Sequence, residues 1–302
     1  MSSYKLEKIS ERSNHSGPVY HLTLGPKSGT CYSSSGDGFV ALWRAPGLEQ
    51  EHEAVRIGEP VYCSRYVPSL NWLLAGTSSG SIHVIDRESR RELFNKQVHP
   101  GGVFDLLPVG EEELLIAAGA DGTLSVWQLP SMELMVQLPI CEGKIRRLVA
   151  VQGTTEFVAA CGDGTIRWME TTFFNETKRL VCGKEGVTAL AFHPHKPVLL
   201  AGDKSAMMHA WNLQTDSLLL SIPAHNFTIY DISPHPQLPL LATASRDKTI
   251  KLWSSSDLAV IDRKGPGEGG HTHSVNRLLW IDGETLISCG DDRKIIAWKL
   301  RS

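Results

Sequence analysis

Residues 245–253 read SRDKTIKLW, and this stretch decides the fold because its pattern returns along the chain. Arg246, Asp247 and Lys248 predict a tight turn, and the alternation that follows predicts a short strand ending in a buried aromatic, Trp253. One such stretch says little by itself. The test is whether a turn Asp or Ser is followed, six residues later, by a large apolar residue elsewhere.

The pattern occurs seven times. The matching stretches are DGFVALW (37–43), SGSIHVI (79–85), DGTLSVW (121–127), DGTIRWM (163–169), SAMMHAW (205–211), DKTIKLW (247–253) and DRKIIAW (292–298). Their last residues are numbered 43, 85, 127, 169, 211, 253 and 298, so successive intervals are five of 42 and one of 45. Equal intervals indicate seven copies of one unit, which excludes two unrelated domains and predicts a single domain over residues 1–302.

Each unit is predicted to be all-β. In the sixth unit four strands are expected, TIYDIS (228–233), LLATAS (240–245), TIKLW (249–253) and AVIDR (259–263), with Pro, Gly, Asn, Asp and Ser between them. Four short strands per 40–45 residues is the period of a propeller blade. We therefore expect an all-β, seven-bladed β-propeller.

The two ends of the chain predict how the ring closes. The last unit stops at IIAWKLRS (295–302), so its fourth strand is missing, and a spare strand, YKLEKIS (4–10), precedes the first unit. We expect the N-terminal strand to pair with the third strand of the last unit and complete the last blade. An open array would carry capping repeats instead, and neither end resembles one.

Composition limits the class of function. The formal net charge of the 302 residues is −3, so no overall basic field attracts nucleic acid or an anionic membrane. The start, MSSYKLEKIS, has no apolar signal segment, and no apolar run is long enough to span a bilayer. The six cysteines form no C-x-x-C pair and no zinc-ligand spacing. These features predict a soluble protein of a reducing compartment, cytoplasmic or nuclear.

The repeat resembles that of the WD40-repeat family over essentially the whole chain. That family's repeat starts with Gly-His, has Val or Ile four residues after the His, and carries an Asp in the turn before the strand that ends in Trp. The stretches that match its start are HSGPV (15–19), HPGGV (99–103), HNFTI (225–229) and HTHSV (271–275). The chain departs from the family pattern because no Trp is followed by Asp and because the second, fourth and fifth repeats lack the His.

The resemblance implies buried networks running from Trp to Ser or Thr, to His, to the turn Asp. An indole N–H only donates, a hydroxyl passes the bond on, and an imidazole links it to a carboxylate. The networks are expected in three units, with the members His15, Ser33, Asp37 and Trp43; His225, Thr243, Asp247 and Trp253; and His271, Ser288, Asp292 and Trp298. Because these units adjoin the predicted closure, we expect that region to be the most strongly specified. The sets recur at blade period, which favours a structural role over catalytic triads.

Other chemistry is weakly indicated. FHPHKP (192–197), SPHP (233–236) and GGHTH (269–273) are His-rich, but alternate residues of an extended chain point to opposite sides and no third ligand converges on them. The Asp-Gly pairs are typical of hairpin turns, not of phosphate loops. We therefore expect no catalytic residue, no metal ligand and no cofactor.

The resemblance places the partner-binding site on the top face, at the rim of the channel. The residue after the first-strand Val or Ile occupies this rim, and the residue before the turn Asp or Ser faces the same side. The predicted partner-binding residues are Tyr20, Tyr62, Phe104, Arg146, Tyr230, Asn276, Lys204, Arg246 and Asp291. Tyr and Arg are typical interface anchors, although strands favour aromatics in any case. The loop RKGPGEGG (263–270) holds four extra residues on this face, and either shapes a pocket or is an inert flexible insertion.

These observations predict a non-catalytic interaction platform, monomeric within a larger assembly. It would bind a peptide or protein segment on its top face and bring proteins together, without contacting nucleic acid, membrane or a small-molecule substrate. One alternative is a reader of basic tails, as in some WD40 subunits of chromatin complexes, because aromatic rims attract cations. The other is an enzyme that uses the mouth of the channel.

Overall fold

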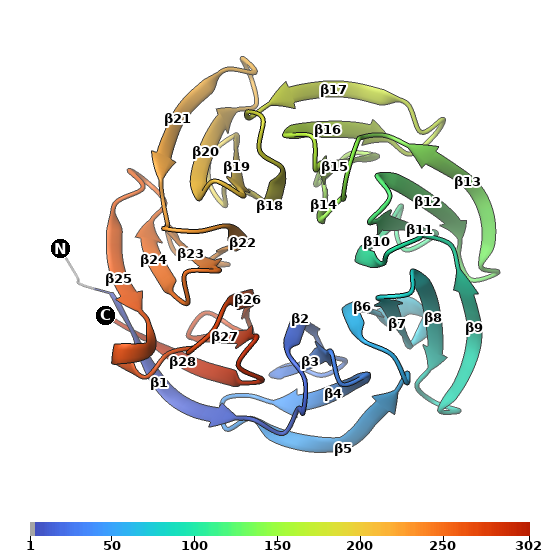
Figure 1. Ribbon diagram of the computed structural model, residues 1–302, viewed down its shortest axis with the longest axis horizontal. Coiled ribbons are helices and arrows are strands. Elements are labelled where there is room, and N and C mark those ends of the chain that lie inside the picture. The colour runs from blue at the N-terminus through green and yellow to red at the C-terminus, as the bar shows by residue number, and fades with distance from the viewer. Residues whose placement is uncertain (1–3) are drawn as a thin grey trace. The chain divides into compact units, whose positions relative to one another are not determined.

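The computed structural model describes residues 4–302, apart from the side chain of residue 52, and they form two compact units. Unit 1 comprises residues up to Gly58 together with Ala189–Ser302, and unit 2 comprises Glu59–Thr188. Seven four-stranded antiparallel sheets make up the two units (Figure 1). This is the all-β, seven-bladed β-propeller that the 42-residue period predicts.

Unit 2 contains three sheets whose strands pair in chain order. The strands are β6 (Val61–Val67), β7 (Trp72–Thr77), β8 (Ser81–Asp86) and β9 (Arg91–Gln97); β10 (Val103–Val109), β11 (Leu114–Gly119), β12 (Thr123–Gln128) and β13 (Glu133–Pro139); and β14 (Arg147–Ala150), β15 (Glu156–Ala160), β16 (Thr165–Glu170) and β17 (Glu176–Val181). The first strands β6, β10 and β14 lie side by side within this unit (Figure 1).

Unit 1 contains the other four sheets, and β18 begins at the boundary between the units. Three have chain order: β2 (Val19–Leu24), β3 (Thr30–Ser35), β4 (Phe39–Arg44) and β5 (Glu49–Arg56); β18 (Val187–Phe192), β19 (Val198–Asp203), β20 (Met207–Asn212) and β21 (Leu218–Pro223); and β22 (Ile229–Pro234), β23 (Leu240–Ser245), β24 (Ile250–Ser254) and β25 (Val260–Lys264). The fourth sheet has the order β1 (Lys5–Arg12), β28 (Ile295–Arg301), β27 (Thr285–Gly290) and β26 (Val275–Trp280).

The N-terminal strand completes the last sheet, as the sequence predicts. β1 pairs antiparallel with β28, from Lys5 opposite Arg301 to Arg12 opposite Ile295. Leu6 is buried in the core of that sheet, and its backbone N–H donates to Asp262 at 2.7 Å. β28 therefore has a partner on each side, and the edge that would invite pairing with other chains is covered.

The core lies between successive sheets, which explains the strand sequences. In unit 2 one buried cluster joins Cys63 and Leu74 of the first sheet to Val103, Leu115 and Trp127 of the second. Inner strands such as β3, β23 and β27 are buried along their whole length, so small and apolar residues fill both faces. The fourth strands alternate or are mostly exposed, as in β13 and β21.

The only helical segments in residues 4–302 are two 3-10 turns, η1 (Pro68–Leu70) and η2 (Pro266–Glu268). Three residues fall far short of the length at which an apolar helix crosses a bilayer, and no membrane-spanning helix is present in this part of the chain.

Candidate functional site

The predicted rim residues sit in β-bulges. In five first strands the pairing with the second strand skips one residue between the buried Val or Ile and the next paired residue. The skipped residues are Tyr20, Tyr62, Phe104, Tyr230 and Asn276. A bulge releases one residue from the ladder and turns its side chain away, a device common beside binding sites. Sequence spacing found these positions but gave no sign of the bulges.

Three of the predicted rim residues come together in unit 2. The rings of Tyr62 and Phe104 are stacked, with centroids 5.2 Å apart and planes 15° apart. The Arg146 guanidinium lies 4.8 Å from the Phe104 centroid, and the Lys144 ammonium lies 5.1 Å from it. We call Tyr62, Phe104, Lys144 and Arg146 the unit-2 rim. Lys144, an exposed residue two positions before Arg146, was not predicted because it lies in a loop, outside the positions that the repeat makes equivalent.

A glycine makes room for the stacked rings. A Cβ on Gly102 would lie 2.9 Å from Cε2 of Tyr62, closer than side-chain atoms approach. Gly102 also has φ of 123°, a conformation that other residues rarely adopt. The ring position of Tyr62 therefore depends on this glycine.

Further charges lie in the neighbouring positions of the same first strands. Asp105 is 1% exposed, and its Oδ2 accepts a hydrogen bond from the backbone of Leu148 at 2.9 Å. Arg65 approaches Asp105 at 3.5 Å and Arg147 at 3.7 Å. Burial lowers the pKa of Arg65, although Asp105 opposes that effect. Two cations, Arg65 and Arg147, therefore face one buried carboxylate, while Lys144 and Arg146 lie at the Phe104 ring.

The remaining predicted rim residues belong to unit 1 and behave differently. The Asn276 side chain donates to Oδ1 of Asp291 at 2.8 Å and to the carbonyl of Val19 at 2.9 Å, so these two predicted residues partner each other. The Arg246 guanidinium lies 6.0 Å from the ring of Phe227, which is 58% exposed. Sequence reasoning missed Phe227. Lys204 is exposed, whereas Tyr20 and Tyr230 are half-buried.

The 263–270 loop is held in place at several points. Its backbone N–H at Gly265 donates to Glu268 at 2.8 Å, η2 forms within it, and Lys8 of β1 donates to the carbonyl of Gly269 at 3.0 Å. Of the two interpretations of this loop, the flexible insertion fits these contacts poorly.

The three predicted networks are hydrogen-bonded in the expected order. In the β22–β25 sheet, Trp253 donates to the hydroxyl of Thr243 at 2.8 Å. His225 Nε2 lies 2.7 Å from the same hydroxyl, and His225 Nδ1 lies 2.9 Å from Asp247. The sets built on His15 and His271 repeat this arrangement with separations of 2.7–2.9 Å.

In the network of His225 and Asp247, hydrogen bonding and burial together set the protonation of both groups. Burial disfavours ionisation of Asp247, but bonds from His225, Thr249 and the backbone of Asn226 outweigh it and hold the pKa of Asp247 well below its ordinary value. Burial lowers the pKa of His225 more than Asp247 raises it. At neutral pH an ionised carboxylate therefore accepts from a neutral imidazole.

The expectation of only three networks is wrong, because unit 2 contains a fourth. His99 lies 3.2 Å from Asp121 and 2.8 Å from Ser125, and Trp127 donates to Ser125 at 2.9 Å. The hydroxyl of this network belongs to Ser125 on β12, the third strand of its sheet. The position on the second strand that carries the hydroxyl in the other three networks is occupied here by Ala117. The networks are therefore not confined to the sheets beside β1, and they do not single out that region as the most strongly specified.

A cavity of about 250 Å³ in unit 1 adjoins one network and bears on the enzymatic alternative. His15, Asp37 and Trp43 are among its lining residues. Ser33 would be the nucleophile of a triad, but it is fully buried and already accepts the indole N–H of Trp43. A nucleophile needs access to its substrate, so this geometry suits a structural network.

Similar sequences are WD repeat proteins. WD repeat-containing protein 37 of Xenopus tropicalis is 24% identical over 216 residues, which cover 68% of this chain and 40% of the relative. Periodic tryptophan protein 2 homolog of Dictyostelium discoideum is 23% identical and covers 84% of this chain and 28% of the relative. Human striatin-4 is 22% identical and covers 79% and 35%. The chain thus spans well under half the length of these curated relatives.

The family comparison identifies the repeat itself. The WD40 family (WD domain, G-beta repeat) matches residues 6–44, 175–212, 216–254 and 268–299. The matched segments include all three networks predicted from the sequence, those that end in Trp43, Trp253 and Trp298. With seven four-stranded sheets and these matches, the chain is a β-propeller that carries WD40 repeats in the matched segments.

Proposed function

We propose that this WD40 propeller is a non-catalytic interaction platform whose unit-2 rim binds an acidic segment of a partner protein. The observation that carries the proposal is the stack of Tyr62 and Phe104 with two cations at the Phe104 ring. Aromatic and Arg side chains supply most of the energy at protein interfaces, and the bulges turn these residues out of the sheet.

Charge selects the kind of partner. Lys144 is exposed and Arg146 is half-buried, whereas Glu142 is the exposed carboxylate of the 142–146 loop. Arg65 and Arg147 already face the buried Asp105, which balances part of their charge. A basic tail would meet like charges beside the aromatic rings, and Phe104 already has cations at its ring. An acidic segment would gain charge-assisted hydrogen bonds, so the reader of basic tails is the weaker alternative.

The platform would act within a cytoplasmic or nuclear assembly, as a monomer that brings other proteins together. WD40 propellers generally bind proteins, and the relatives carry their matching segment within longer chains. An enzymatic role is disfavoured because the Ser, His and Asp sets recur at blade period with buried hydroxyls.

Fluorescently labelled peptides test the proposal. A panel of Glu-rich, neutral and Lys-rich peptides, each with one Tyr, is titrated into the protein and followed by anisotropy. We expect the acidic peptides to bind, and the Tyr62→Ala, Arg146→Ala double variant to lose affinity by about 2 kcal/mol, roughly 30-fold.

A matched control lies in exposed loops of unit 1. Gln237→Ala with His195→Ala alters two exposed side chains that follow first strands β22 and β18, and should leave affinity unchanged. Selective binding of the Lys-rich peptides would favour the reader of basic tails. Loss of binding in the control alone would move the site to that loop surface.

A further inference from the structure

The β14–β17 sheet carries different chemistry at the positions of the structural network. The network residues of the preceding sheet have equivalents 42 residues later. Cys141 stands in place of His99, Arg167 in place of Ser125 and Met169 in place of Trp127, while the turn Asp is kept as Asp163. The backbone supports this equivalence: the N–H of His99 donates to Gly80 at 3.1 Å, and that of Cys141 donates to Gly122 at 3.2 Å. Cys141 therefore occupies the place of a network histidine.

A second cysteine lies beside Cys141. Cys161 follows β15 at the position of Gly119 in the preceding sheet. The two sulfur atoms and one carboxylate oxygen of Asp163 all lie within 4.8 Å of one another. Cys141 is half-buried, and Cys161 is fully buried. Local spacing does not predict this pair, because the cysteines are 20 residues apart.

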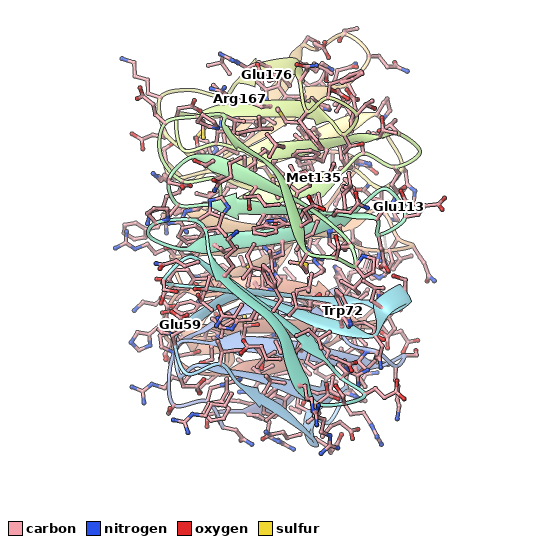
Figure 2. The ribbon with its side chains drawn as sticks, turned by 90° about the vertical axis from the view of Figure 1, so that its right-hand side faces the viewer. Glu59, Trp72, Glu113, Met135, Arg167 and Glu176 are labelled. Carbon is pink, nitrogen blue, oxygen red and sulfur yellow. The ribbon has the colours of Figure 1, made fainter. Side chains whose placement is uncertain are left out.

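The neighbouring ion pair argues against a metal site. Arg167 donates to Oδ2 of Asp163 at 2.7 Å, and Oδ1 accepts from the backbone of Thr165 at 3.0 Å and from its hydroxyl at 2.6 Å. Arg167 also reaches Glu176 at 3.2 Å, and both residues are labelled on the β16 and β17 strands in Figure 2. Asp163 is the one carboxylate beside the two thiols, and a metal ion would have to displace Arg167 from it. The two thiols are therefore the reactive groups of this site.

The two thiols differ in reactivity. A hydrogen bond from Cys161 lowers the pKa of Cys141 against the effect of burial, and Arg167 adds to the lowering. The bond to Cys141 and burial raise the pKa of Cys161. The accessible thiol is thus the one that more readily becomes a thiolate, which is the attacking species in disulfide exchange.

We propose that Cys141 and Cys161 are a redox-active dithiol that exchanges with a low-molecular-weight disulfide such as glutathione disulfide. After losing its proton to water, the Cys141 thiolate attacks one sulfur, the disulfide bond breaks, and one glutathione thiolate leaves. Cys161 then gives up its proton to that thiolate and attacks the Cys141 sulfur, expelling the second glutathione, which takes a proton from water. Two protein thiols are oxidised to one disulfide as glutathione disulfide is reduced to two glutathiones.

Closing the bond requires a local movement. A disulfide needs the sulfurs about 2.05 Å apart, so the segment from Ile140 to Lys144 must shift toward β15. Gly143 lies in this segment with φ of 80°, and a Cβ there would meet only atoms of Gly162 at 3.6 Å or more. The hinge needed for the reaction is therefore adjacent to the attacking cysteine.

The test uses the purified, reduced full chain with excess glutathione disulfide, quenched with acid and mapped by peptide mass spectrometry. Wild type should give a disulfide that links the peptides of Cys141 and Cys161. Cys161→Ser should stop at a stable glutathione adduct on Cys141. Cys141→Ser should give neither product, because Cys161 is buried.

Cys182 provides the matched control, since it is also half-buried and its N–H makes the equivalent bond to Gly164. Cys182→Ser should keep the internal disulfide, and Cys141 should react at least about tenfold faster than Cys182. Equal modification of Cys141 and Cys182 without an internal disulfide would overturn the proposal. So would one tightly bound Zn²⁺ per chain that is lost in both Cys141→Ser and Cys161→Ser.

Discussion

The β10–β13 and β14–β17 sheets of unit 2 share a backbone plan but stabilise it in different ways. The first connects its turn to its core through His99, Ser125 and Trp127. The second keeps the turn Asp, pairs it with Arg167, and has Met169 where the indole would be. The difference teaches that the blade depends on satisfying the turn carboxylate, while the group that satisfies it can change.

The largest expected difference concerns the apolar anchors. Trp127 is fully buried and packs edge-on against Phe94 with centroids 5.5 Å apart. Trp127→Ala should cost about 4 kcal/mol, and Met169→Ala about 2 kcal/mol, because the smaller and flexible side chain leaves less space behind. Urea unfolding of both variants measures this. Equal losses would mean that the network contributes nothing beyond packing at the first site.

The turn carboxylates should differ less. Asp121→Ala leaves the buried His99 without its partner and should cost about 1–2 kcal/mol. Asp163→Ala should cost below about 1 kcal/mol, because Arg167 keeps Glu176 at 3.2 Å and the ion pair is partly exposed. Asp247→Ala removes the carboxylate of a more buried network and should lower the free energy of unfolding by about 1–3 kcal/mol. The comparison fails if chemical denaturation ranks Asp163→Ala above Asp121→Ala.

Acid should affect the two sheets unequally. Burial lowers the pKa of His99 below its ordinary 6.5, although Asp121 opposes this. A lowered folded-state pKa means that the unfolded chain takes up the proton first, so this contribution is present above about pH 6.5 and is lost as pH falls. His99→Gln should therefore lose less stability than wild type between pH 7.5 and 5. Parallel pH profiles would contradict the proposed protonation of the network.

The smallest effect is expected at the unit-2 rim. Tyr62 is skipped by its ladder and Arg146 precedes β14, so Tyr62→Ala with Arg146→Ala should leave the melting temperature within about 2 °C of wild type. Differential scanning calorimetry provides the measurement. A larger drop would show that the unit-2 rim also holds the sheets together, and its binding data would then need a milder variant.

The sequence predicted the fold because the period is read directly from Trp43 to Trp253, and because each network needs one residue of each type at fixed spacing. It missed the network of His99, since its hydroxyl had moved from the second strand to Ser125 on the third. Lys144 and Phe227 were missed because they lie in loops, where periodicity does not fix the contacts. The Cys141–Cys161 pair was missed because both cysteines lie in loops, which the fold and not the spacing along the chain brings together.

The bulges in the first strands also bear on how such a molecule changes over generations. At Tyr20, Tyr62, Phe104, Tyr230 and Asn276 a half-buried residue takes no part in the pairing register that the core requires. Selection can therefore replace these residues one at a time while the scaffold remains intact. The same property makes them natural positions for a combinatorial library, in which new specificities are sought by varying five residues of an otherwise constant chain.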